Sequence, residues 1–172
     1  MQNVMNKIKE IFEDYKVVPG VSIDPYGLAS PGGPWIVGSF ALWHYQKNIM
    51  GNQPDWQYDD IDYVVHTEEQ GNQLLNYFRQ LGESERLLYN DIYRFDKAQV
   101  NIKLYDDIRF RLYVHDIDVC QVGSDNKNFY LSSSAHNSIT NNLCKFTGNT
   151  FDQERTNKRI QKYVKRGFKY TD

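Results

Sequence analysis

The sequence predicts a single α/β domain whose sheet contains strands of both directions. Short apolar runs alternate with segments of helical periodicity, and one pair of apolar runs is separated by a tight polar turn at Asp96 and Lys97. The chain has 172 residues, the length of one compact domain. We therefore expect one mixed β-sheet flanked by helices.

The composition excludes several classes of protein. The net charge of −2 argues against a surface that binds nucleic acid everywhere, but leaves room for a local basic patch. Cys120 and Cys144 have no metal-binding spacing, so we expect buried, reduced thiols. The apolar runs are far shorter than the ~20 residues that span a bilayer, and the charged N-terminus lacks the apolar core of a signal peptide. We therefore expect a cytoplasmic protein with no membrane association.

The first 34 residues are expected to pack on the domain as a helix and a loop. Residues 1–16 have an apolar stripe at helical spacing, and residues 17–34 contain four of the five prolines, which predicts a loop. Residues 35–154 are expected to form the core. Residues 155–172 are expected to form a basic C-terminal helix and tail of the same domain.

The hydrophobic pattern places the elements of the core. We first expect a strand at 35–37, a helix at 40–49, a polar loop at 50–59, a strand at 61–65, and a helix that begins after Thr67 and buries Leu74, Leu75, Phe78 and Leu81. Thr67 and Gln70 are predicted to form its capping box, and Gly82 to end it. We then expect a hairpin of 93–95 and 100–104, a segment at 107–114 that fits either a strand or a helix, a strand at 115–122, a polar loop and a short helix near 133–143.

One sequence pattern in the core is typical of a site that binds phosphate and a metal ion. A strand is followed by Gly38 and Ser39, a helix, and then Asp60 and Asp62 on the next strand. A Gly-Ser turn lets backbone N–H groups and a hydroxyl approach a phosphate at the N-terminus of the helix. Residues i and i+2 of a strand point to the same face, so the two carboxylates can hold Mg²⁺. The pattern predicts a site for a phosphate and a divalent cation.

A third carboxylate from a neighbouring strand would complete a site for two metal ions, which can stabilise the attacking and leaving oxygens of phosphoryl transfer. Asp116 and Asp118 are the candidates, again at i and i+2 of an expected strand. The spacing does not decide between them.

These motifs resemble the signature of the nucleotidyltransferase superfamily, whose fold is shared with DNA polymerase beta and poly(A) polymerases. The resemblance rests on the segments IVGSFAL at 36–42 and DDIDYVV at 59–65. The second half, with HDIDVCQV at 115–122, NNLCKF at 141–146 and RTNKRIQKYVKRGFKY at 155–170, is similar to small stand-alone nucleotidyltransferase-like proteins found mainly in phages and large DNA viruses.

The resemblance implies a mixed sheet of the nucleotidyltransferase type and transfer of a nucleoside monophosphate from an NTP to a hydroxyl acceptor, with release of pyrophosphate. Gly38 and Ser39 would hold the triphosphate. Asp60, Asp62 and Asp116 would bind two Mg²⁺ ions, with Mn²⁺ as a substitute and Asp118 as the alternate ligand. The third acid would also help to deprotonate the acceptor, which could be RNA, DNA, a protein or a small molecule. A viral copy would act in the host cytoplasm.

The chain departs from the family pattern at three places. Ser39 stands where many members have a second glycine, His115 replaces an aromatic residue, and residues 50–59 are an insertion. The aromatic residues near this insertion can be interpreted as base-stacking groups or as a cover for the edge of the core: Trp43, Trp56 and Tyr58.

The C-terminal segment from Arg155 to Lys169 has seven basic residues and no acidic one. An apolar stripe at helical spacing predicts an amphipathic helix with one cationic side. That side can be interpreted as a solvated surface, or as contacts to an NTP or a nucleic-acid acceptor through Arg159, Lys162 and Arg166.

The same residues are compatible with two rival functions. A non-catalytic viral module could keep the fold and bind nucleic acid or a protein, and a metal-dependent nuclease could use the same acids without needing the Gly-Ser turn. The four histidines have no zinc-site spacing, and a Walker A sequence is absent. The sequence does not predict an oligomeric state.

Overall fold

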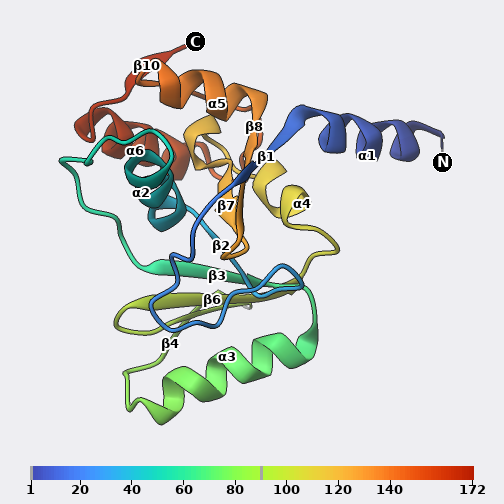
Figure 1. Cartoon of the computed structure of the whole chain (residues 1–172), viewed down its shortest axis with the longest axis vertical. Coiled ribbons are helices and arrows are strands. Elements are labelled where there is room, and N and C mark those ends of the chain that lie inside the picture. The colour runs from blue at the N-terminus through green and yellow to red at the C-terminus, as the bar shows by residue number, and fades with distance from the viewer. Residues whose placement is uncertain (1, 90) are drawn as a thin grey trace.

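A mixed eight-stranded sheet forms the centre of the computed structural model, which describes residues 2–89 and 91–172 (Figure 1). Its strand order is β1-β8-β7-β2-β3-β6-β5-β4. The strands are β1 (Tyr15–Pro19), β2 (Trp35–Val37), β3 (Ile61–Val65), β4 (Arg86–Tyr89), β5 (Ile92–Arg94), β6 (Ala98–Leu104), β7 (Val122–Ser124) and β8 (Asn128–Ser132). Neighbouring strands are antiparallel except for the parallel pair β3 and β6. The expected mixed sheet flanked by helices is confirmed.

Helices pack around this sheet, and a small parallel pair of strands lies beside it. The helices are α1 (Gln2–Asp14), α2 (Ser39–Asn48), α3 (Glu68–Gln80), α4 (Ile108–Tyr113), α5 (Ser133–Thr140) and α6 (Gln153–Lys165). The pair consists of β9 (Leu143–Lys145) and β10 (Lys169–Thr171). None of the helices in the described part of the chain is long and apolar enough to cross a membrane.

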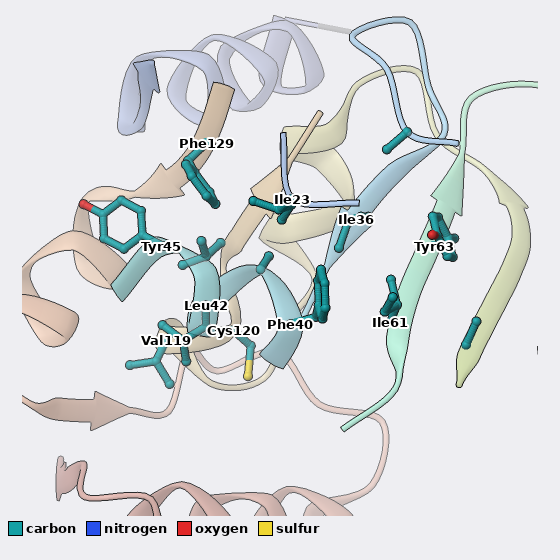
Figure 2. Close-up of a cluster of buried hydrophobic side chains, with 14 of the residues drawn as sticks. Ile23, Ile36, Phe40, Leu42, Tyr45, Ile61, Tyr63, Val119, Cys120 and Phe129 are labelled. Atoms are coloured by element: carbon teal, nitrogen blue, oxygen red, sulfur yellow. The ribbon is translucent and has the colours of Figure 1, made fainter. Parts of the chain in front are cut away.

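The main core lies around α2. Figure 2 shows its side chains Phe40, Leu42 and Tyr45 among residues of the sheet and of the turn before β7. Leu42 and Ile36 are fully buried. Because α2 is held on the sheet by this contact, its first residues are fixed next to the start of β3.

The connection from β3 to β6 passes through α3, as parallel neighbours require. The predicted capping box starts α3: Thr67 accepts a hydrogen bond from the Gln70 backbone N–H, at 3.2 Å, and the Gln70 side chain accepts from the Thr67 N–H. Gly82 follows the helix with a φ of 73°, as expected for a glycine that ends a helix. Leu81 is half exposed, so its placement in the buried stripe is wrong.

The long N-terminal loop is shorter than expected, because residues 15–19 form β1 and pair with β8. The remaining loop packs against the sheet. Asp24 accepts a hydrogen bond from the Tyr63 hydroxyl on β3 (2.6 Å), and three backbone N–H groups of the loop also donate to its carboxylate. Strand β8, within a region expected to be a polar loop, was also missed by the sequence prediction.

The prediction of a strand at 115–122 is wrong. Ile117 makes only an isolated bridge to Phe146, and residues Asp118–Cys120 form a 3₁₀ turn before β7. The ambiguous segment at 107–114 is a helix, α4, with Asp107 as its N-cap. The predicted helices at the N-terminus and near 133–143 are present as α1 and α5. Both cysteines are buried and unpaired with one another, as expected.

Candidate functional site

A cavity of about 450 Å³ lies where α2, β3, β6, α4 and α6 meet. This volume is in the range of small-molecule sites. Three carboxylates, Asp59, Asp60 and Asp62, line it, together with five basic side chains: Arg94, Arg111, Arg155, Arg159 and Lys162. The lining therefore carries two more positive than negative groups, which favours an anionic ligand.

Gly38 and Ser39 form one corner of the cavity at the start of α2. Gly38 has a φ of 80°, a conformation that favours glycine, and a β-carbon at this position would lie 2.6 Å from the Oδ2 atom of Asp62. The buried Ser39 hydroxyl accepts a hydrogen bond from the Asp59 backbone N–H, at 3.0 Å. The first N–H groups of a helix have no partners within the helix, so this corner suits a phosphate.

Asp60 and Asp62 both line the cavity from the start of β3, as their i and i+2 spacing predicts. Asp60 forms an ion pair with Arg94 on β5, with 3.2 Å between Oδ2 and Nε. No hydrogen bond to the Asp62 carboxylate is found within residues 2–89 and 91–172. Burial raises the pKa of Asp62 to about 7, the charges of Asp60 and Asp59 add to this, and those of Arg111 and Arg159 oppose it.

The neighbouring strand brings amides to the same face. In the parallel register of β3 and β6, Gln99 pairs with Asp62 and Asn101 pairs with Val64. Both Gln99 and Asn101 line the cavity, whereas Val100 between them is fully buried in the core. The strand next to Asp62 therefore presents neutral amide side chains to the cavity.

Asp116 and Asp118 point to different partners, because the segment that carries them is not a strand. Asp116 accepts a hydrogen bond from Thr156 (2.8 Å) and forms an ion pair with Arg159, with 3.2 Å between Oδ1 and Nε. It lines a neighbouring pocket, which shares Arg111, Arg155 and Arg159 with the main cavity. The role of Asp116 as the third acid stays a prediction.

Asp118 is buried beneath α5. It accepts hydrogen bonds from the hydroxyls of Ser134 (2.7 Å) and Ser138 and from the backbone N–H of Lys145 (2.9 Å). The four predicted metal ligands do not form one cluster: among the described residues, no group of three His, Cys, Asp or Glu side chains could hold a metal ion. Asp60 and Asp62 alone of the four share the cavity.

The basic C-terminal segment forms a wall of the cavity. Arg159 and Lys162 of α6 line it. Arg166, just after α6, lies against the 50–59 loop instead: it donates to the Gln57 carbonyl (3.1 Å), pairs with Asp59 (3.2 Å) and stacks on Trp56, 4.6 Å from the ring centre. Lys162 also pairs with Asp59. The acidic and basic groups are therefore joined across the edge of the cavity.

The aromatic residues near this loop cover the edge of the core. Trp56 is buried, and its carbonyl accepts a hydrogen bond from the Trp43 indole at 2.9 Å. Tyr58 packs edge-on against Phe40 and Trp43. Of the two interpretations of these rings, the structure favours the cover over base stacking.

Several residues of the cavity were missed in the sequence: Arg94, Gln99 and Asn101, and also the pair Arg111 and His115. Arg111 on α4 and His115, two residues after the end of this helix, lie with 2.9 Å between the Arg111 Nη1 and His115 Nε2 atoms. Burial lowers the pKa of His115 well below its usual value, and the charges of Arg111 and Arg159 lower it further. Neutral His115 can therefore accept from Arg111. The helical reading of 107–114 would have placed this pair on one face.

The oxygen donors in the cavity fit a divalent cation. Carboxylate and amide oxygens are the ligands that Mg²⁺ prefers, and Asp60, Asp62 and Gln99 supply them on one face of two adjacent strands. Asp62 gains most from such an ion, because its raised pKa reflects a partly buried carboxylate without a hydrogen-bond donor among the described residues.

Comparison with solved structures identifies the fold. The chain is similar to the Thermotoga maritima CCA-adding enzyme complexed with tRNA, with a TM-score of 0.58 and 14% identity over 95% of this chain and 42% of that one. It is also similar to a CCA-adding enzyme in complex with CTP (TM-score 0.58, 13% identity, 95% and 43% covered) and to a tRNA-processing enzyme in apo form (TM-score 0.53, 11% identity, 99% and 43% covered).

The protein therefore has the fold of the nucleotidyltransferase head of CCA-adding enzymes, and the expected fold class is confirmed. The chain spans less than half the length of these enzymes. No protein-family model matches it, and no curated protein matches it either.

Proposed function

We propose that the protein binds a nucleoside triphosphate with a divalent cation and transfers its nucleoside monophosphate to a hydroxyl acceptor, releasing pyrophosphate. One observation supports this most strongly: the Gly38-Ser39 corner and the Asp60-Asp62 pair share one cavity that carries an excess of positive charge. An NTP with one bound Mg²⁺ is an anion, and its phosphates and cation match these two parts of the cavity.

Each group in the cavity has a proposed role. Gly38 and Ser39 hold the phosphates at the N-terminus of α2, and Arg159 and Lys162 contact them from α6. Asp60 and Asp62 hold the cation, which when bound would neutralise charge on the phosphates during transfer. Arg166 is assigned to positioning the loop rather than to binding phosphate, because it lies outside the lining of the cavity and contacts Trp56, Gln57 and Asp59.

The solved relatives suggest the substrates. The similar structures are described as complexes with CTP, ATP and tRNA. We infer by analogy that the acceptor is the hydroxyl end of an RNA, with DNA, a protein or a small molecule as alternatives. The similarity to phage and large-DNA-virus proteins, and with it the host cytoplasm as location, stays a prediction.

A second candidate is nucleotide binding without transfer. The lining of the cavity favours it, because neither Asp116 nor Asp118, the residues expected to supply the third carboxylate that binds metal and deprotonates the acceptor, is part of that lining. Such a protein would bind an NTP with its cation and release it unchanged.

Transfer of label from each radiolabelled NTP to total tRNA or cell lysate, with Mg²⁺, tests the proposal. We expect the wild type to transfer label and the Asp60→Ala/Asp62→Ala variant to lose it. Asp55→Ala is the matched control, because Asp55 is an exposed carboxylate outside the cavity lining. Transfer by the double variant would contradict the mechanism. NTP binding without transfer would favour the second candidate, and cut nucleic acid would favour the nuclease.

A further inference from the structure

We propose that Gln99 is the third ligand of the cation in this cavity, and that the site holds one divalent ion rather than the two expected from the sequence. The inference rests on the proposed nucleotide and cation site. It goes further by assigning a residue on β6 and a metal stoichiometry to that site.

The strand register carries the assignment. In the parallel pair β3 and β6, Asp62 is paired with Gln99, and the fully buried Tyr63 is paired with the fully buried Val100. Side chains alternate along each strand, so Asp62 and Gln99 lie side by side on the face opposite to the core. Both line the cavity. A third ligand from a neighbouring strand would come from this position, and here it is an amide, whose carbonyl oxygen can still bind a divalent ion.

The other acids near the cavity are already held by protein groups. Asp59 pairs with Lys162 and Arg166, and it is half exposed at the edge. Asp116 is held by Thr156 and Arg159. A second ion would have to take a further carboxylate from one of these pairs, in addition to Asp60, which the first ion already shares with Arg94.

Charge in the cavity also limits the number of ions. Asp60 is shared with Arg94, so Asp62 is the carboxylate of the pair that has no ion-pair partner among the described residues. The lining already has more positive than negative groups. A second divalent ion would add two charges next to Arg111 and Arg159, and no further carboxylate in the described lining is free to balance them, which Coulomb repulsion opposes. A glutamate at position 99 would supply such a carboxylate.

Titration with Mn²⁺ tests the inference, with bound ions counted by electron paramagnetic resonance in the presence of a non-hydrolysable NTP analogue. We expect one ion per wild-type chain. Gln99→Leu should weaken Mn²⁺ binding on the order of tenfold, because one ligand is lost. Gln99→Glu should bind a second ion or tighten the first. Asn101→Leu is the matched control: it lines the cavity on the same strand but pairs with Val64, so Mn²⁺ affinity should stay unchanged.

Each outcome decides for or against Gln99. Two ions in the wild type, or equal Mn²⁺ affinity in Gln99→Leu and the wild type, would overturn the inference. Asp116→Asn should leave the Mn²⁺ affinity unchanged. If Asp116→Asn instead lost as much Mn²⁺ affinity as Asp62→Asn, Asp116 would be the third ligand, and the inference about Gln99 would be overturned. The protein could bind one Mn²⁺ ion in a way that depends on Gln99 and still transfer no label. That result would support the inference about Gln99 and overturn the proposed transfer. Absence of any bound ion overturns both.

Discussion

Gly38 approaches Asp62 so closely that any larger residue at position 38 would collide with the carboxylate: a β-carbon there would lie 2.6 Å from Oδ2. The contact joins the start of α2 to the start of β3. The two halves of the candidate site, the phosphate corner and the carboxylate pair, are therefore direct neighbours. The glycine is needed here for space as well as for its φ of 80°.

Gly38→Ala should therefore disturb the site more than glycine conformation alone explains. Gly51 provides the control, because it has a similar φ of 72° but nothing within 4 Å of a β-carbon. We expect Gly51→Ala to lower the free energy of unfolding by about 1 kcal/mol. Gly38→Ala should lower it further and also weaken binding of an NTP with Mg²⁺, as measured by calorimetry. Equal effects of both variants on stability and binding would contradict a special contact at Gly38.

Asp62→Asn should stabilise the metal-free protein at high pH. The pKa of Asp62 is raised to about 7 in the folded chain, mainly by burial, against about 3.9 in an unfolded chain. Stability from this group is therefore full below about pH 4 and is lost as the pH rises through 7. We expect urea unfolding at pH 8 to show the variant more stable than the wild type, by on the order of 2 kcal/mol after allowance for solvent screening.

Two further measurements make this prediction specific. Near pH 3 the variant and the wild type should have similar stability, because the Asp62 carboxyl is then protonated in the folded chain and mostly protonated in the unfolded chain. At pH 8, added Mg²⁺ should raise the melting temperature of the wild type more than that of Asp62→Asn. A wild type that is more stable than Asp62→Asn at pH 8 without metal would contradict the burial argument.

The phosphate corner and the first carboxylates could be predicted from the sequence, because local rules place them. Gly38 and Ser39 follow a short apolar strand, and Asp60 and Asp62 share a face by strand alternation alone. Gln99 could not be assigned in the same way. Its place beside Asp62 depends on pairing between β3 and β6, which the sequence does not specify.

The rest of the site depends on tertiary contacts. Asp116 and Asp118 have the spacing of a strand, but three hydrogen bonds to the Asp118 carboxylate favour a turn over the strand. Arg111 lies on α4, which has six residues and is too short for a clear period. Strand β1 was missed because its partner, β8, lies more than a hundred residues away in the chain.

Arg166→Ala should release the 50–59 loop from the end of α6. The guanidinium stacks on Trp56 and donates to Gln57, so its loss removes contacts that a simple charge does not supply. We expect a loss of about 1–2 kcal/mol in the free energy of unfolding and a change in tryptophan fluorescence. Arg166→Lys should retain only part of the stability and only part of the wild-type tryptophan fluorescence. Lys165→Ala is the control for charge, because Lys165 is exposed, and an equal loss in this variant would contradict the role of stacking.

Asp118→Ala should destabilise the protein without a direct effect on metal binding. The Asp118 carboxylate is 1% exposed and accepts from Ser134, Ser138 and the Lys145 backbone N–H. Its removal leaves the buried Ser138 hydroxyl and two partly buried donors, the Ser134 hydroxyl and the Lys145 N–H, without this acceptor, which should cost about 2–3 kcal/mol in the free energy of unfolding. Chemical denaturation measures this cost directly.

The metal affinity of the same variant separates support of the fold from ligation. Mn²⁺ affinity per folded chain should match the wild type in Asp118→Ala, since Asp118 faces α5 and not the cavity. The matched change Ser138→Ala removes one of the donors and should lower stability in the same direction but by less, about 1 kcal/mol. The opposite result would be an Asp118→Ala variant that keeps the stability of the wild type and loses Mn²⁺ binding to the extent expected for Asp62→Asn. Asp118 would then be a metal ligand and not a residue that supports the fold through α5.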